Sequence, residues 1–80
     1  FDTAKKLERL IKDAFVSIDY QDYFLVLKTI HGNAYALGKL IESSNFDGVF
    51  GTIAGDDTIL IICRSATAAN QIQDQLLSLV

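Results

Sequence analysis

The sequence contains no proline, no methionine and only one cysteine, Cys63. A single cysteine excludes an internal disulfide, and an unpaired thiol predicts a reducing, cytoplasmic setting. No apolar run approaches the roughly 20 residues that a membrane-spanning helix needs, and no signal-peptide pattern is present, so a membrane is not an expected partner. Because the chain begins at Phe1 and lacks methionine throughout, we expect it to be a fragment of a longer protein.

Positive charge is also scarce. Seven Lys and Arg residues stand against ten Asp and Glu residues, which gives a net charge of −3 and a sequence pI near 4.8. Proteins that bind nucleic acid need clustered Lys and Arg to neutralise phosphates. The composition therefore argues against DNA binding by this segment itself. The basic residues near the N-terminus are interpreted as a solvated helix face: Lys5, Lys6, Arg9 and Lys12.

Hydrophobic residues, by contrast, make up half of the chain. Eighty residues form one domain at most, and a domain of that size buries a smaller fraction of its surface than a larger one does. An isolated monomer would have difficulty hiding so much apolar surface. The composition therefore predicts a partner surface, most simply a symmetric self-association.

The hydrophobic periodicity predicts a helix followed by two strand–strand–helix units. The expected helices cover residues 1–12, about 31–44, and a C-terminal segment capped by Ser65 or Thr67. The expected strands cover residues 15–20, 23–30, 48–54 and 58–63. This order predicts an α+β fold, a two-layer sandwich with a four-stranded, mostly antiparallel sheet and two helices on one face (ββαββα), preceded by an N-terminal linker helix.

Two of the expected strands are apolar on both sides of the pleat. They contain the runs Phe24–Leu27 and Ile59–Ile62. In a two-layer fold the helices cover only one face of the sheet, so the other face must find cover elsewhere. The pattern predicts that a second subunit supplies this cover.

The stretch GTIAGDDTI, Gly51–Ile59, is unusual for its charge. Asp56 and Asp57 stand between two apolar strands, with no Lys or Arg between Lys39 and Arg64. Adjacent carboxylates repel each other and are costly to desolvate without a cation. One interpretation is a solvated hairpin tip, where Asp is a common turn residue. The other is a cation site that is filled when subunits close over it.

GTIAGDDTI resembles the signature of the C-terminal domain of bacterial arginine repressors. The similarity runs from about Asp13 to Val80, through DAFVSIDYQDYFLVLKTIHGNA before the motif and ILIICRSATAANQIQDQLLSLV after it. The resemblance implies an oligomerisation and L-arginine-binding domain over 14–80, behind a linker helix over 1–13. It implies trimers that stack into hexamers, with L-arginine, the co-repressor, bound between the trimers. Operator DNA would be bound only by an absent N-terminal winged-helix domain, so the protein would regulate transcription and would not be an enzyme.

The resemblance also implies a set of arginine-binding positions, and no metal: Asp56, Asp57, Tyr35, Glu42, Thr52 and Ala54. The two aspartates would hold the arginine, one in its own subunit's pocket and the other across the trimer–trimer interface. The two strand residues would offer backbone carbonyls to the amino group of the ligand.

Helix geometry independently places three residues together. Residues seven apart lie only about 20° apart around a helix, so Tyr35, Gly38 and Glu42 form one stripe beside the apolar stripe. Family members usually carry Gln at the position of Tyr35 and Asp at that of Glu42. We expect the Tyr35 hydroxyl to donate to the ligand carboxylate and Glu42 to reach the α-ammonium. The alternative is that the tyrosine ring fills the pocket and arginine no longer binds.

Three other functions compete with this one. A Gly-Asp-Asp hairpin also holds divalent metal in viral RNA polymerases, but a tripeptide is a weak signal and 80 residues are too few for such an enzyme. An amino-acid-sensing module similar to an ACT domain would usually show the order strand–helix–strand–strand–helix–strand. A paralogue with changed or lost ligand response would act as an oligomerisation module.

Two further residues have simpler interpretations. His31 is expected to be an ordinary turn residue rather than a titrating switch, since no second His or Cys stands at metal-ligand spacing. Cys63, at the end of a strand, is expected to be a small core residue.

Overall fold

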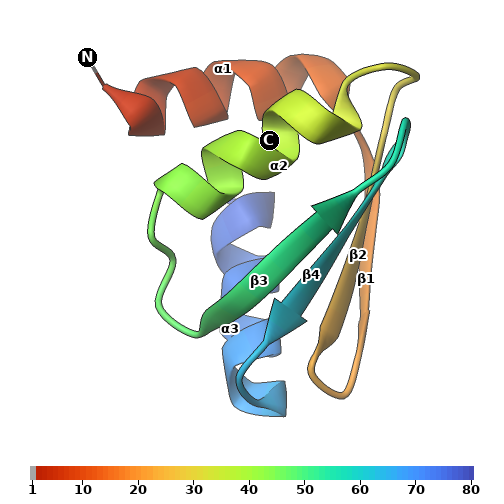
Figure 1. The fold of residues 1–80 in the computed structure, drawn as a ribbon. Coiled ribbons are helices and arrows are strands. Elements are labelled where there is room, and N and C mark those ends of the chain that lie inside the picture. The colour runs from red at the N-terminus through yellow and green to blue at the C-terminus, as the bar shows by residue number, and fades with distance from the viewer. Residues whose placement is uncertain (1) are drawn as a thin grey trace.

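The computed structural model describes residues 2–80 and contains the predicted order of elements (Figure 1). The helices are α1 (Thr3–Ala14), α2 (Ala34–Ser43) and α3 (Ala66–Leu77), and the strands are β1 (Phe15–Gln21), β2 (Phe24–Thr29), β3 (Val49–Ala54) and β4 (Thr58–Cys63). Phe1, which the first predicted helix includes, lies outside the described residues. None of the helices in residues 2–80 is long and apolar enough to cross a membrane.

The four strands form one sheet in the order β1-β2-β4-β3. All three pairings are antiparallel, so the predicted antiparallel sheet is confirmed. β1 and β3 are the edge strands, and the register of each shifts close to its first residue, between Phe15 and Ser17 in β1 and between Val49 and Gly51 in β3. Such bulges increase the local twist of an edge strand.

The helices pack on one face of this sheet, as Figure 1 shows. α2 lies mainly against β3, α3 lies mainly against β1, and α1 packs against α2. The predicted two-layer α+β arrangement is therefore confirmed. α1 also belongs to the packed structure, because Leu7 and Ile11 are buried in the core. The division into a linker helix over 1–13 and a domain over 14–80 stays a prediction.

The core lies between the sheet and the helices. Its largest fully buried side chains alternate along β2 and β4 and repeat at helical spacing on α1, α2 and α3: Leu25, Leu27, Ile59, Ile61, Ile11, Leu37, Ile41, Ile72 and Leu76. Cys63 is also buried, so its predicted place in the core is confirmed.

The first and last helices begin at side-chain caps. Asp2 Oδ1 accepts a hydrogen bond from the Ala4 N–H at 3.1 Å, and Ser65 Oγ accepts one from the Ala68 N–H at 3.0 Å. These caps satisfy N–H groups that have no partner inside a helix. Asn33, the residue before α2, makes no such bond with its side chain. The start of α2 therefore depends on hydrogen bonds to another segment.

Two glycines have positive φ angles and different surroundings. At Gly48 φ is +92°, and an added Cβ would stand 2.6 Å from the Ala68 Cβ. At Gly32 φ is +87°, and an added Cβ would meet nothing within 4 Å. The turn before β3 thus passes close to α3, and only glycine fits both the backbone and the space there.

Candidate functional site

A pocket of about 80 Å³ lies between α2 and β3. Residues of α2 and β3 line it: Tyr35, Gly38, Lys39, Glu42, Thr52 and Ala54. Four of these six were predicted as site residues, two from the helix and two from the strand. The structure therefore brings together both the helical stripe and the strand residues that precede the two aspartates.

Gly38 lies where the helix and the strand meet at this pocket. It is buried on α2, and a Cβ added there would lie 3.4 Å from the Ala54 Cβ and 3.8 Å from Cγ2 of Ile59. The close contact at Gly38 is thus between α2 and the sheet of the same chain. At these distances an added methyl group makes ordinary van der Waals contact, so only a side chain larger than alanine would separate α2 from β3 and change the shape of the pocket.

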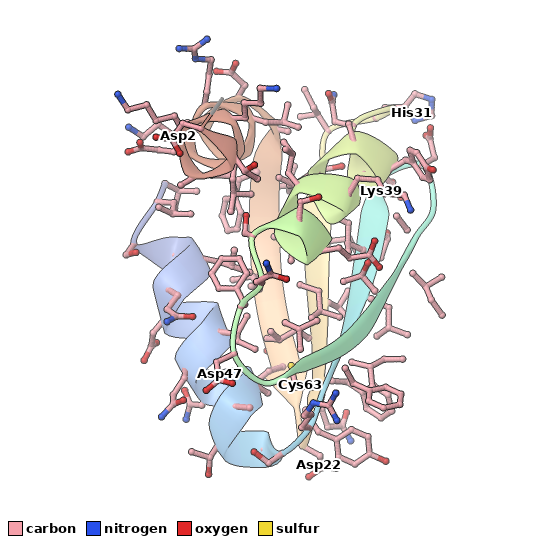
Figure 2. All side chains as sticks on the ribbon, turned by 60° about the vertical axis from the view of Figure 1, so that its left-hand side comes forward. Asp2, Asp22, His31, Lys39, Asp47 and Cys63 are labelled. Atoms are coloured by element: carbon pink, nitrogen blue, oxygen red, sulfur yellow. The ribbon has the colours of Figure 1, made fainter. Side chains whose placement is uncertain are left out.

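Lys39 is a pocket residue that the sequence analysis did not identify. Its Nζ lies 3.7 Å from Oε1 of Glu42 and 5.4 Å from the centroid of the Tyr35 ring. Figure 2 shows that Lys39 lies at the same end of the molecule as His31. The spacing of Lys39, four residues after Tyr35 and three before Glu42, is the signal that could have revealed it, because residues at these separations are neighbours on a helix surface.

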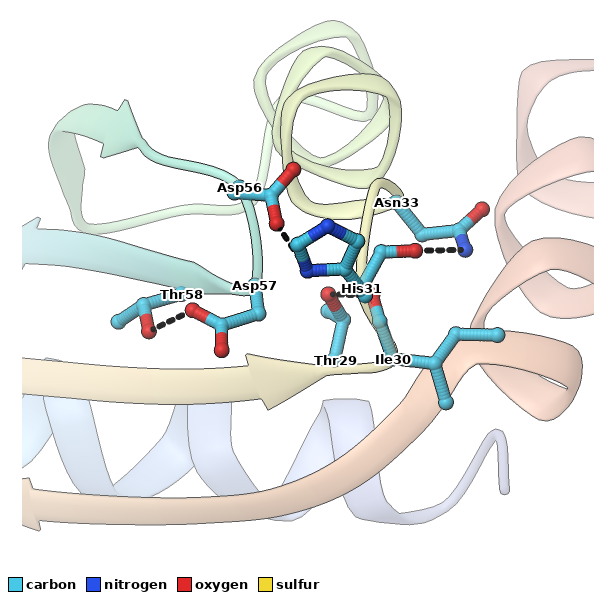
Figure 3. Close-up of polar contacts among 7 residues, drawn as sticks. All are labelled: Thr29, Ile30, His31, Asn33, Asp56, Asp57 and Thr58. Atoms are coloured by element: carbon cyan, nitrogen blue, oxygen red, sulfur yellow. Dashed lines mark hydrogen bonds and ion pairs between the residues drawn. The ribbon is translucent and has the colours of Figure 1, made fainter.

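Asp56 and Asp57 lie in the loop between β3 and β4, and each has a different side-chain partner (Figure 3). The carboxylate of Asp56 pairs with Nδ1 of His31. Oδ1 of Asp57 accepts a hydrogen bond from the Thr58 hydroxyl at 3.0 Å, and that hydroxyl accepts one from Lys28 Nζ at 3.1 Å. His31 does lie in a turn, as expected, but its contact with Asp56 was not predicted.

The main chain of the same loop is tied to the start of α2. The Asp56 carbonyl accepts hydrogen bonds from the N–H groups of Gly32, at 3.0 Å, and Ala34, at 3.3 Å. The Asp57 carbonyl accepts one from the Thr29 N–H at 2.8 Å. The Asp56 carbonyl thus supplies the acceptor that Asn33 does not, and it holds the aspartates at the N-terminal end of the helix that lines the pocket.

The two aspartates remain open to solvent in a single chain. The Asp56 side chain is 54% exposed even beside His31, and the whole loop from Gly55 to Asp57 is exposed. Carboxylates in this position keep much of their hydration and can accept a cation from another molecule. The site therefore combines two exposed carboxylates with a small pocket that contains one further carboxylate and one ammonium group.

Metal binding is an alternative use of the two aspartates. Within residues 2–80 there is no group of three or more His, Cys, Asp or Glu side chains that could hold a metal ion. The carboxylates of the loop instead contact a histidine and a threonine.

The outer face of the sheet carries a second surface of interest. Antiparallel partners lie on the same face, and the register pairs Phe24 with Ile62 and places Leu60 beside both Val26 and Ile53. These five residues form the outer-face cluster, on the sheet face that the described helices leave uncovered. A hollow of about 580 Å³ runs along β1, β2 and β4 beside it. Exposed apolar patches of this kind mark surfaces that contact other molecules.

Comparison with known proteins identifies relatives of this chain. The family described as "Arginine repressor, C-terminal domain" matches residues 11–78. The arginine repressors of Staphylococcus aureus strains JH9, Newman and USA300 are each 46% identical over 80 residues, which is all of this chain. The chain spans about half the length of these relatives, 53% of each. The chain therefore belongs to the arginine repressor C-terminal domain family.

Proposed function

We propose that this chain binds free L-arginine, as a co-repressor, in the pocket between α2 and β3 and at the loop that carries Asp56 and Asp57. One observation carries the proposal: main-chain hydrogen bonds join the exposed carboxylates to the start of the helix that lines the pocket. A long cationic amino acid has a charged group at each end. This arrangement offers partners for both ends on a single rigid unit.

The orientation of the ligand follows from the charges. A planar guanidinium pairs with carboxylates through two parallel hydrogen bonds, which favours its placement at Asp56 and Asp57. The α-ammonium group then lies in the pocket, near the carboxylate of Glu42 and the backbone carbonyls of Thr52 and Ala54. No metal ion is needed in this arrangement.

We further propose that the chain assembles into trimers and that two trimers form a hexamer. The outer-face cluster has the apolar character of a surface buried between subunits. In the hexamer, one aspartate serves the pocket of its own subunit and the other reaches across the trimer–trimer interface. Without ligand the facing carboxylates repel each other, and arginine replaces this repulsion with attraction.

The proposed role of the whole protein is arginine-responsive transcriptional regulation in the cytoplasm. The chain has a net charge of −3, and this balance is unfavourable for contacts with phosphates. Binding of operator DNA is therefore assigned to an N-terminal domain outside this chain. Arginine would act on it by fixing the hexamer that holds the DNA-binding domains in place.

A second candidate is a paralogue with a changed or lost ligand response that acts as an oligomerisation module. The observation that favours it is the position of Lys39, whose ammonium group lies close to Glu42 in the pocket. Tyr35 and Glu42 also differ from the residues usual in the family. In this case the chain would assemble in the same way whether or not arginine is present.

Calorimetry of the chain against arginine, citrulline, ornithine and lysine tests the proposed function. Arginine should bind most tightly, and at 100 times its Kd it should add about 2.7 kcal/mol to the free energy of unfolding. Light scattering should show trimers shifting to hexamers as arginine is added. Absence of arginine binding, with assembly intact, would favour the second candidate, and a monomer in both conditions would contradict the proposed assembly.

A further inference from the structure

Lys39 is the only cationic side chain that lines the pocket among the residues that the structure describes, and the proposed function gives it no role. Its ammonium group is held between two neighbours, the Glu42 carboxylate at 3.7 Å and the Tyr35 ring at 5.4 Å from its centroid. Both neighbours attract a cation. A positive charge is therefore positioned beside the pocket in which the main part of an amino acid would bind.

An α-amino acid carries an ammonium group and a carboxylate on the same carbon atom. The pocket offers the complementary pair on one face of α2, three residues apart. Glu42 would contact the ammonium group and Lys39 would contact the carboxylate. Asp56 and Asp57 cannot take this role, because they would repel a carboxylate. Lys28, another cation near the loop, already donates to Thr58.

We infer that Lys39 binds the α-carboxylate of the ligand and makes the site specific for free amino acids that carry one. The inference rests on the proposed function, which supplies the ligand. It adds the residue that distinguishes arginine from other guanidinium compounds, and it assigns a role to the one charged pocket residue that lacked one.

The contact between Lys39 and Glu42 is weak enough to open around a ligand. The Lys39 side chain is 60% exposed and that of Glu42 is 39% exposed, and exposed ion pairs of this type contribute only about 0–1 kcal/mol. A cavity needs roughly 10–15 Å³ to hold one water molecule. The pocket, at about 80 Å³, has room for the few heavy atoms around the α-carbon.

The opposite role is also physically reasonable and gives an opposite result. Lys39 could act as a plug, with its ammonium group occupying the place of the ligand's own ammonium beside Glu42. Removal of Lys39 would then strengthen the binding of any cationic ligand, with or without a carboxylate. The sign of the effect therefore separates the two roles.

The test is calorimetry with arginine and with agmatine, which is arginine without its carboxylate. The unchanged chain should bind arginine about tenfold or more tightly than agmatine, as expected for a charge-assisted hydrogen bond. Lys39→Gln should weaken arginine binding by a similar factor and leave agmatine binding nearly unchanged. Lys39→Arg should restore the preference for arginine.

Lys12→Gln is the matched control. Lys12 is also an exposed helical lysine paired with a glutamate, at 3.4 Å from Glu8, but it lies on α1 away from the pocket. This variant should bind both ligands as the unchanged chain does.

Three outcomes would overturn the inference. If the unchanged chain binds arginine and agmatine equally, or if Lys39→Gln weakens both alike, Lys39 does not recognise the carboxylate and the proposed function survives. If Lys39→Gln binds both ligands more tightly, Lys39 is a plug. If the unchanged chain binds neither ligand, the proposed function fails and this inference fails with it.

Discussion

Nδ1 of His31 pairs with the carboxylate of Asp56, so one of the two aspartates proposed to bind arginine already has a side-chain partner within its own chain. The pair is open to solvent, with the His31 side chain 90% exposed. Exposed ion pairs contribute little to stability. The guanidinium of a ligand can therefore compete with the His31 imidazole for the Asp56 carboxylate.

Replacement of His31 should consequently strengthen arginine binding by a small factor. His31→Gln removes the imidazole that competes for the Asp56 carboxylate, and the gain should not exceed about fivefold, since exposed pairs contribute at most about 1 kcal/mol. Calorimetry of the variant and of the unchanged chain measures this gain. A weaker affinity in the variant would mean that His31 helps to bind the ligand.

Neutralising the aspartates should have the opposite and larger effect. Asp56→Asn and Asp57→Asn keep the shape of the side chain and remove the charge that pairs with a guanidinium. Loss of a desolvated charged hydrogen bond costs on the order of 2–3 kcal/mol, and calorimetry should show that loss for arginine. Both side chains are exposed, so thermal melting should change little. Unchanged arginine binding in both variants would place the site elsewhere.

A charge on the outer face of the sheet should prevent self-association. Ile53 belongs to the outer-face cluster and is 63% exposed, and Ile53→Glu would place a charge in the proposed subunit interface. Light scattering should then show a monomer. Leu77→Glu is the matched control, because Leu77 is an exposed apolar residue at the end of α3, in the helical layer. Equal assembly of the two variants would locate the interface away from β3.

The two glycines with positive φ should respond differently to alanine. Gly32→Ala has open space and should cost only the backbone strain, about 1–2 kcal/mol. Gly48→Ala has the same strain and also a contact of 2.6 Å with the Ala68 Cβ, and such overpacking typically costs a further 1–3 kcal/mol or so. Urea denaturation should therefore show a lower free energy of unfolding for Gly48→Ala. Equal losses would mean that α3 moves away without cost.

The thiol of Cys63 should react slowly in the folded chain. Burial raises the pKa of the Cys63 thiol, and the thiolate, rather than the thiol, is the nucleophile. Iodoacetamide should thus label the native chain slowly, even in mildly alkaline buffer, and label it rapidly in denaturant. Rapid labelling of the native chain would indicate that the end of β4 opens often. The labelling rate in arginine should be lower still if the ligand stabilises the fold.

The order of helices and strands was predictable because burial imposes periodicity on the sequence. Leu25 and Leu27 alternate on β2, and Leu37 and Ile41 repeat on α2, and each pair is buried in the structure. Helix arithmetic alone also placed Tyr35 and Glu42 on one stripe, and both line the pocket. The strand residues of the pocket came only from the family resemblance, since no periodicity relates a strand to a distant helix. Their role in binding arginine stays a prediction.

Contacts between distant segments could not be predicted in this way. The pairing of His31 with Asp56 depends on how the β3–β4 loop meets the start of α2, and neither residue's neighbours in the sequence carry that information. Lys39 was missed for a different reason. It was considered only as the last cation before Arg64, although residues three or four apart are neighbours on a helix surface and its long side chain reaches both Tyr35 and Glu42.

The hydrogen bonds from Gly32 and Ala34 to the Asp56 carbonyl have a consequence for ligand length. They join the aspartate loop to α2 through the main chain, so the main-chain distance between the loop and the pocket is held and only the side chains can adjust the span. Under the proposed function, this distance favours ligands whose two charged groups are equally far apart. An amino acid shorter by one methylene would leave a charge at one end without its partner. The site would then select among cationic amino acids by the length of their side chains as well as by their charge.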